Sequence, residues 1–287
     1  MLYEQQTINC RGRLLDLSQP VVMAILNLTP DSFYDGGVYQ SDNQVLSQVE
    51  RFLSEGATII DVGGMSSRPG AEIISSEEEL QRVIPSIEQI IKRFPEAILS
   101  IDTLSSKVAK AAVESGARIV NDISAGRHDE DMIPLVGQLK TPYVAMHMQH
   151  TPKTMQEAPI YDDVCETVMR FLIERIDLCR KAGILDVIID LGFGFGKTVE
   201  HNYELLRNME AFKILEVPIL AGLSRKSMIC KPLKVNPKDA LNGTTALHMV
   251  ALQQGARILR VHDVREAMEV IKLWQLTKEP LKEVSEA

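Results

Sequence analysis

The chain has 287 residues, of which 45% are hydrophobic and 24% charged, a composition typical of globular proteins. Its formal net charge of −8 argues against a general nucleic-acid-binding or anionic-membrane surface, so an anionic substrate would need a local basic pocket. The N-terminus has no apolar signal core, no apolar run reaches the length of a membrane span, and the four cysteines lack CxxC spacing. We therefore expect a cytoplasmic protein with reduced thiols that acts on small molecules and binds neither nucleic acid nor membrane.

Eight short, nearly continuous apolar runs follow one another along the chain, and most of them precede a helical pattern. The runs occupy residues 21–27, 57–63, 97–103, 118–124, 142–148, 187–193, 218–224 and 256–263. Such runs are typical of strands buried on both faces of a parallel sheet. The alternation predicts an α/β protein with a single (β/α)8 TIM barrel over residues 1–287. A doubly wound open sheet is the less favoured alternative, because no linker divides the units into halves.

The two ends of the chain and two of the helices have signals of their own. Residues 1–18 predict a short N-terminal hairpin that closes the barrel bottom, and residues 278–287 a frayed tail. Amphipathic patterns predict helices over residues 76–94 and 163–183. Pro85 lies inside the first of them, so this helix is either kinked or begins nearer to Pro85.

The stretch NLTPDSFYDGG, residues 27–37, follows the first strand directly. It combines amide, hydroxyl, carboxylate and aromatic side chains with two glycines, which is more chemistry than a turn requires. In (β/α)8 barrels the loops that follow the strands carry the active site. We therefore expect the polar residues at the strand ends to form one site.

Three of these polar residues, Asp102, Asn121 and Asp190, interrupt apolar strands. Burying one such group is costly unless it has a partner, and for a single residue that partner can be a neighbouring loop amide. Three of them at one level of the barrel favour a ligand over structural capping. Two acceptors and one mixed donor and acceptor suit a flat heterocycle rich in N–H groups and ring nitrogens.

The stretch GFGFGK, residues 192–197, does not fit a phosphate-binding loop. A Walker A loop would need glycine at position 191, which is leucine, and GxGxxG would need glycine at position 197, which is lysine. We interpret its glycines as positions where the backbone passes close to a ligand or to a neighbouring loop. Phe193 and Phe195 are candidates for the wall of an aromatic substrate site.

The stretch SRKS, residues 224–227, follows the seventh strand and is expected to begin a helix. Free backbone N–H groups at a helix start attract anions, and barrels often bind phosphates after strands seven and eight. Lys226 is a candidate contact to a ligand carbonyl, and Ser227 to a carboxylate.

Arg260 and His262 alternate along the eighth strand, so both should point the same way. An arginine and a histidine on one inward face suit a diphosphate. A salt bridge from Arg260 to Asp263 or Glu266 is the less favoured alternative.

Candidate metal ligands are few. His147 and His150 are three residues apart, but a zinc site is not favoured without a helix, a cysteine or a third histidine nearby. A hard cation such as Mg²⁺ needs few protein ligands when a diphosphate supplies oxygens, and Asn27 is then a candidate ligand. A Schiff base on Lys226 is conceivable, but it would leave the strand-end polar residues unexplained.

Taken together, these motifs resemble the dihydropteroate synthase family along nearly the whole chain. NLTPDSFYDGG is similar to the family's first loop and GGMSSRPGAE to its second, and SIDT, VNDIS, MHMQ, DLGFGFGK, GLSRKS, NGTTA and RVHDV follow in the family's order. The resemblance implies a (β/α)8 barrel that joins 6-hydroxymethyl-7,8-dihydropterin diphosphate to p-aminobenzoate in folate synthesis. The products would be 7,8-dihydropteroate and diphosphate, and sulfonamides would compete with p-aminobenzoate.

The resemblance also implies roles for individual residues. The pterin would be held by Asp102, Asn121, Asp190 and Lys226, with Arg260 over its face. The diphosphate and Mg²⁺ would contact Asn27, Arg260 and His262.

For the second substrate, Ser227 would receive the benzoate carboxylate. The benzoate ring would lie among Phe33, Pro69, Phe195 and Lys226, and the two loops would add Asp35, Ser67 and Arg68 as they close over the diphosphate. The residues implied to be catalytic are Asp35, Arg68, Asp102, Asp190 and Lys226.

The sequence departs from the family's pattern at four positions. Met65 replaces a frequent glutamate, Ser67 the usual threonine, His150 a usual glycine and Leu191 a usual proline. None of these changes removes a residue that is expected to take part in the chemistry.

Two other functions stay open at this point. A methyltransferase that passes a methyl group from methyltetrahydrofolate to a corrinoid protein shares the barrel and the pterin site, but has no use for the SSRPG loop or for SRKS as a benzoate site. A non-catalytic pterin-binding homologue should have lost parts of the two loops, and both are intact here. The resemblance further implies a homodimer.

Overall fold

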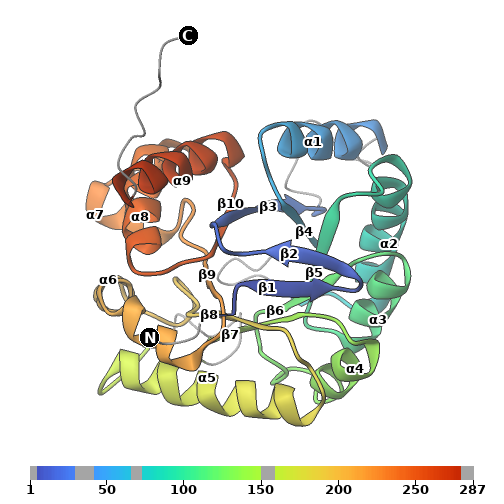
Figure 1. The fold of residues 1–287 in the computed structure, drawn as a ribbon, viewed down its shortest axis with the longest axis horizontal. Coiled ribbons are helices and arrows are strands. Elements are labelled where there is room, and N and C mark those ends of the chain that lie inside the picture. The colour runs from blue at the N-terminus through green and yellow to red at the C-terminus, as the bar shows by residue number, and fades with distance from the viewer. Residues whose placement is uncertain (1–4, 30–41, 66–72, 150–158, 279–287) are drawn as a thin grey trace.

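The computed structural model describes residues 5–29, 42–65, 73–149 and 159–278. Within these residues, eight parallel strands close into a barrel in the order β10-β3-β4-β5-β6-β7-β8-β9. The helices surround the strands, and in Figure 1 they follow one another around the ring from α1 to α9. The predicted (β/α)8 barrel is confirmed, and the open sheet is excluded because the last strand pairs directly with the first barrel strand.

Every predicted barrel strand is found, and all but the first are shorter than predicted. The barrel strands are β3 (Val21–Asn27), β4 (Ile59–Gly63), β5 (Ile98–Asp102), β6 (Ile119–Asp122), β7 (Tyr143–Met146), β8 (Val187–Asp190), β9 (Ile219–Ala221) and β10 (Ile258–Val261). The apolar runs extend beyond the strands because the first loop residues are also buried, as Leu191 and Leu223 are. Burial alone therefore overestimates where the hydrogen-bonded ladder ends.

The helices occupy the segments between the strands. They are α1 (Asp42–Ser54), α2 (Ser76–Arg93), α3 (Ser106–Glu114), α4 (Met132–Leu139), α5 (Val164–Lys181), α6 (Val199–Arg207), α7 (Ser227–Leu233), α8 (Leu241–Gln253) and α9 (Val264–Lys278), with 3₁₀ turns η2 (Met209–Leu215) and η3 (Pro237–Asp239). Both helices predicted from amphipathic patterns, α2 and α5, are confirmed. The alternative in which α2 begins near Pro85 is wrong, because the Ser75 hydroxyl accepts a hydrogen bond from the Glu78 N–H and so caps the helix ten residues earlier.

A small antiparallel hairpin, β1 (Thr7–Cys10) and β2 (Arg13–Asp16), closes the amino-terminal end of the barrel, as predicted. It lies across the centre of the ring in Figure 1. Its buried side chains pack on one inward-facing residue from each barrel strand. This cluster consists of Ile8, Cys10, Leu15 and Leu17 of the N-terminal segment and of Met23, Ile59, Ile98, Ile119, Val144, Ile188, Leu220 and Ile258.

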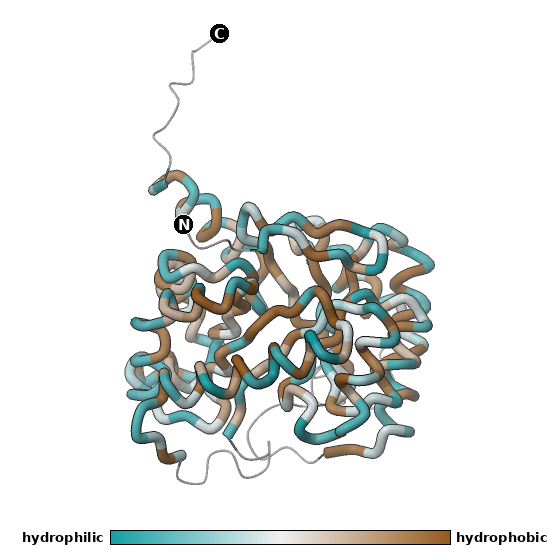
Figure 2. The backbone as a smooth tube through the Cα atoms, turned by 60° about the horizontal axis from the view of Figure 1, so that its bottom comes forward, coloured by the Kyte–Doolittle hydropathy of each residue, from teal (hydrophilic) through white to brown (hydrophobic). Residues whose placement is uncertain are grey.

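A second and larger core lies between the strands and the helices. The outward-facing strand residues, such as Val22, Ile60 and Leu99, pack there against buried residues of the helices, such as Val83 and Ile87 of α2. The outer helices alternate between teal and brown along the tube in Figure 2, which is the pattern of helices with one apolar face. None of the described helices is long and apolar enough to cross a membrane.

The strand register brings polar residues together at the carboxyl-terminal end of the barrel, here called the barrel mouth. Asn27 is paired with Gly63, Gly63 with Asp102, and Asp102 with Asn121 across four consecutive strands. In-register residues of neighbouring strands point to the same side of the sheet, so Asn27, Asp102 and Asn121 all face the barrel interior. Of the three strand-end residues predicted to share a level, Asp102 and Asn121 are in register. Asn121 pairs with Val144 and Val144 with Ile188, so Asp190 lies two residues further along its strand.

Candidate active site

Arg260 is the central charge of the barrel mouth. Its Nε donates a hydrogen bond to Asp61 Oδ2 at 2.7 Å, and its Nη2 donates one to Asp102 Oδ2 at 2.7 Å. Although burial acts against the charge, the two carboxylates raise the pKa of Arg260 above its usual value. The guanidinium is therefore fixed in place as a permanent cation.

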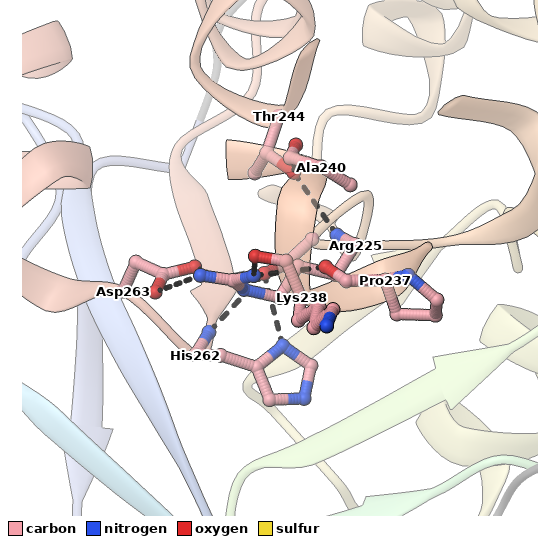
Figure 3. A network of polar contacts seen from close by, with 8 residues as sticks. Arg225, Pro237, Lys238, Ala240, Thr244, His262 and Asp263 are labelled. Atoms are coloured by element: carbon pink, nitrogen blue, oxygen red, sulfur yellow. Dashed lines mark hydrogen bonds and ion pairs between the residues drawn. The ribbon is translucent and has the colours of Figure 1, made fainter. Parts of the chain in front are cut away.

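The alternative partners considered for Arg260 are wrong. Asp263 instead binds both the Nε and the Nη2 of Arg225, each at 2.8 Å. Figure 3 shows the Arg225 guanidinium between this carboxylate and the carbonyl oxygens of Pro237 and Lys238. Arg225 thus joins the loop after β9 to the loop after β10. Because Asp263 pairs with Arg225, Arg260 pairs, among the described residues, only with the carboxylates of the barrel interior.

Asp61 is a site residue that the sequence analysis missed. It is 0% exposed, and its Oδ2 also accepts a hydrogen bond from Asn121 Nδ2 at 2.9 Å. This bond fixes the orientation of the Asn121 amide, because only its nitrogen can donate to a carboxylate. The Oδ1 of Asn121 is then the atom left to accept from a ligand. The missed signal was a carboxylate within the apolar run IIDVG, two residues before the strand end.

The pKa of Asp102 is raised to about 7. Burial is the main cause, Asp61 and Glu79 add to it, and Arg260 opposes it. A carboxyl group with this pKa exchanges its proton near neutral pH and responds to any charged ligand placed beside it.

Asp190 and Lys226 form the opposite side of the mouth. A Cβ on Gly222, between them, would lie 3.6 Å from Asp190 Oδ2 and 3.6 Å from Lys226 Nζ. The Gly192 N–H donates to Asp190 Oδ1 at 2.7 Å, which fixes the carboxylate. Burial raises the pKa of Asp190, and burial also lowers the pKa of Lys226 to about 8 while Asp190 supports its charge.

Asn27 ends β3 at the rim of the mouth and was predicted as a Mg²⁺ ligand. A Cβ on Gly63 would lie 3.6 Å from Asn27 Oδ1 and 3.8 Å from Asp102 Oδ2, so both oxygens border the small space above this glycine. Hard oxygen donors of this kind suit Mg²⁺, which completes its shell with water and substrate phosphates. The residues present fit the ion.

An apolar wall completes the mouth and supplies a surface for an aromatic ring. It consists of the buried residues Met65, Leu104, Ile123, Met146, Met148 and Phe195, with Ile74 packed against them. Lys226 Nζ lies 4.5 Å from the centre of the Phe195 ring. Phe193 was also expected to wall a substrate, and this is wrong: it is 0% exposed and packs in the core between strands and helices.

Ser227 and His262 lie at the outer rim. Ser227 is the exposed first residue of α7, so the prediction that SRKS begins a helix is confirmed. His262 follows β10 and is exposed, and its Nδ1 lies 2.9 Å from Ser224 Oγ. Both side chains are accessible to a ligand that extends from the mouth toward solvent.

Three comparisons with known proteins agree with this geometry. Residues 23–262 match the family model described as pterin binding enzyme. The chain is 47% identical over 269 residues to the dihydropteroate synthase of Escherichia coli K12, which covers 93% of this chain and 95% of the relative. The chain belongs to the dihydropteroate synthase family.

Solved structures of the family have the same fold. The dihydropteroate synthase of Yersinia pestis, in complex with a sulfonamide drug, matches with a TM-score of 0.90 and 42% identity over 95% of this chain and 99% of that chain. The dihydropteroate synthase of Xanthomonas albilineans, in complex with 7,8-dihydropteroate, matches with a TM-score of 0.85 and 40% identity over 95% of this chain and 98% of that chain. Both of these structures, which share the fold of this chain, are of dihydropteroate synthases.

Most residues of the two loops NLTPDSFYDGG and GGMSSRPGAE are not part of the described structure. Phe33, Asp35, Ser67, Arg68 and Pro69, the loop residues implied for the site, lie outside the described residues. Their assignment therefore stays a prediction.

Two of the residues that depart from the family's pattern, Met65 and Leu191, are buried, and a third, His150, was part of the unfavoured zinc site. Met65, in place of a frequent glutamate, packs in the apolar wall, and Leu191, in place of a usual proline, packs in the outer core. His150 lies outside the described residues, and His147 Nδ1 contacts Lys197 Nζ at 3.0 Å, which leaves this nitrogen unavailable to zinc.

Proposed function

We propose that this protein binds a dihydropterin substrate among the buried polar side chains of the barrel mouth. The observation that carries the proposal is the ring of Asp102, Asn121, Asp190 and Lys226 around one fixed cation, Arg260, at the carboxyl ends of the strands. Buried polar groups of this number are kept only where a ligand or a partner satisfies them. The carboxylates accept from pterin N–H groups, and Asn121 Oδ1 accepts from another.

In the reaction, the bond from the pterin methylene carbon to the diphosphate oxygen breaks, and a bond to the p-aminobenzoate nitrogen forms. The amine loses one proton, which leaves with the diphosphate or to water. An aromatic amine is neutral at pH 7 and has a free electron pair, so no general base is required. The demand on the protein is to stabilise the leaving diphosphate and the electron-poor methylene carbon.

The charges of the mouth meet both demands. Arg260 and Lys226 are cations that can neutralise charge as the diphosphate leaves, and His262 and Ser227 at the rim can donate hydrogen bonds to anionic groups. Asp102 and Asp190 can stabilise positive charge that develops on the pterin. The apolar wall with Phe195 keeps water from the same carbon and provides one face for the benzoate ring.

We infer that Asn27 is the protein ligand of a Mg²⁺ ion in this reaction, beside Asp102. When bound, the ion supplies charge neutralisation for the leaving diphosphate. The role of Asn27 is to hold its carboxamide oxygen at the space above Gly63, where the diphosphate would extend out of the barrel.

We further propose that the protein acts in the cytoplasm as a homodimer, with α7 and α8 at the interface. On α8 the polar Thr244 and His248 are buried, whereas the apolar Leu247, Met249 and Val250 are only partly buried. Leu233 at the end of α7 is 55% exposed. A helix that is apolar on several faces needs cover from another surface. Sedimentation equilibrium that gives the monomer mass at micromolar concentration would contradict this.

A direct assay tests the catalytic proposal. The purified protein is incubated with 6-hydroxymethyl-7,8-dihydropterin diphosphate, p-aminobenzoate and Mg²⁺, and 7,8-dihydropteroate is measured by mass spectrometry. We expect product, and competitive inhibition of p-aminobenzoate by a sulfonamide. Binding of the pterin without product would support a non-catalytic homologue instead, and methyl transfer from methyltetrahydrofolate would support the corrinoid methyltransferase.

A further inference from the structure

The GFGFGK stretch contains a buried cation to which the reaction gives no role. Lys197 is 3% exposed, and its ammonium is surrounded by four acceptors. Its Nζ lies 2.8 Å from Gly192 O, 3.0 Å from Phe195 O, 3.2 Å from His147 O and 3.0 Å from His147 Nδ1. These acceptors come from two different loops, the one after β7 and the one after β8.

Glycine conformations make this arrangement possible. Gly192, Gly194 and Gly196 all have positive φ, at 69°, 83° and 61°. A Cβ on Gly192 would lie only 1.8 Å from His147 O, so no other residue fits between the two loops. In this loop Gly192 O accepts a turn hydrogen bond from the Phe195 N–H at 3.1 Å, and Gly192 O and Phe195 O both accept from Lys197 Nζ.

The acceptors match an ammonium ion better than any neutral group. An ammonium only donates, so His147 Nδ1 must be unprotonated, and burial together with the charge of Lys197 lowers the pKa of His147 to about 2. Burial lowers the pKa of Lys197 itself to about 7, against support from Asp190. An apolar side chain of the same length would fill this space but would leave these buried acceptors without their donor, so the lysine serves the loop carbonyls and not packing alone.

The loop that Lys197 holds touches three parts of the active site. The Gly192 N–H donates to Asp190, the Phe193 carbonyl accepts from Lys226 Nζ at 2.5 Å, and the Phe195 ring lies under the same Nζ. The backbone of this loop therefore connects Lys197 with Asp190 and with the apolar wall.

We propose that Lys197 is a positioning residue of the condensation, whose ammonium fixes the 192–196 loop so that Phe195 faces the arylamine and Asp190 faces the pterin. The inference rests on the proposed function, because it assigns the two faces to the two substrates. Lys197 contacts neither substrate and acts through the loop carbonyls.

The first test is Lys197→Met, which keeps the length of the side chain and removes its charge and donors. We expect a folded enzyme in which the KM for p-aminobenzoate rises about tenfold, with a smaller rise for the pterin substrate, because small displacements of a positioned group cost this much or more. Lys110→Met, at an exposed lysine of α3, is the matched control and should leave both KM values unchanged. Unchanged KM values in a folded Lys197→Met enzyme would overturn the proposal.

A double-mutant cycle separates positioning from general destabilisation. If Lys197 acts through Phe195, then Lys197→Met should raise the KM for p-aminobenzoate much less in a Phe195→Ala background than in the wild type. Equal effects in the two backgrounds would contradict the proposal.

A milder variant covers the case in which Lys197→Met does not fold. Tyr161→Phe removes the hydroxyl that donates to Gly196 O at 2.7 Å, a second support of the same loop. It should raise the same KM about twofold to threefold and show the same coupling to Phe195→Ala, and absence of both effects would count against the proposal. A wild-type enzyme without activity would instead refute the proposed function, so the two failures are distinguishable.

Discussion

The interior of the barrel has two halves built by the same strands with opposite chemistry. On β8, Ile188 and Asp190 are two residues apart and both point inward. Ile188 packs in the apolar cluster that the N-terminal hairpin closes, whereas Asp190 faces the polar mouth. The same change occurs along β5 between Ile98 and Asp102 and along β10 between Ile258 and Arg260.

The difference shows how one sheet separates stability from function. The apolar cluster under the N-terminal hairpin, here called the lower cluster, is sealed from water by the hairpin and stabilises the fold by burial of apolar area. The polar mouth contains three carboxylates, of Asp61, Asp102 and Asp190, and the guanidinium of Arg260, all placed where their desolvation is costly. Such a cost is retained where a ligand needs the charges. Substitutions in the two halves should therefore change different properties.

The largest expected effect is that of Asp190→Asn on catalysis. The variant keeps the shape of the side chain but loses the charge that faces Lys226 and that we propose accepts from pterin N–H groups. Losing two charge-assisted hydrogen bonds should lower kcat/KM for the pterin substrate on the order of a thousandfold. The midpoint of thermal unfolding should stay close to that of the wild type. Steady-state kinetics and calorimetry on one preparation test both statements, and a variant that retains wild-type kcat/KM would remove Asp190 from the site.

Ile188→Ala should have the opposite profile. Its side chain is buried completely in the lower cluster, so truncation leaves a cavity that costs about 3 kcal/mol of unfolding free energy. Urea unfolding measures that loss, and kcat/KM at a temperature where the variant is folded should stay within about twofold of the wild type. A loss of activity as large as that of Asp190→Asn would break the separation between the two halves.

Much of this division could be predicted from the sequence. The order of apolar runs predicted the barrel, and a polar residue within an apolar run marked Asp102, Asn121 and Asp190, all of which lie at the barrel mouth. These features depend on local pattern and on the strict alternation of side chains in a strand, which a sequence displays directly.

The partners of the charged groups could not be predicted in the same way. Arg260 and Asp61 are 199 residues apart and meet because β10 closes the barrel against β3, beside β4. Asp61 lies two residues before the end of β4, so its place at the strand end is not marked in the sequence as those of Asp102 and Asp190 are. The role of Lys197 depends on which way loop carbonyls turn, and the sequence shows the glycines but not that direction.

A buried carboxyl group outside the barrel interior should make the stability of the fold depend on pH. Glu79 on α2 is 3% exposed, and burial raises its pKa to about 7 from an ordinary value of 4.5, while Thr103 and Arg82 oppose the shift. Between these pH values the folded chain keeps a proton that the unfolded chain releases. The stability linked to this proton is full below pH 4.5 and is lost as the pH rises through 7.

Glu79→Gln should remove this pH dependence. The unfolding free energy of the wild type should fall relative to that of the variant by on the order of 3 kcal/mol as the pH rises from 4.5 to about 7. Urea unfolding at a series of pH values measures the difference. Parallel stability curves for the two proteins would show that Glu79 titrates alike in both states.

The smallest effect is expected at the boundary between the two halves, where Asp61→Asn keeps shape but changes charge. The new amide can still accept from Arg260 Nε through its oxygen, so the guanidinium keeps that contact and its ion pair with Asp102. It cannot accept from both Arg260 and Asn121 as strongly as a carboxylate oxygen does, and the Asn121 amide loses the partner that fixes its orientation. Calorimetric titration should then show pterin affinity reduced about tenfold, with p-aminobenzoate affinity nearly unchanged. Loss of both affinities together would mean that Asp61 supports the whole mouth, and no loss at all would mean that Asn121 is held by other contacts.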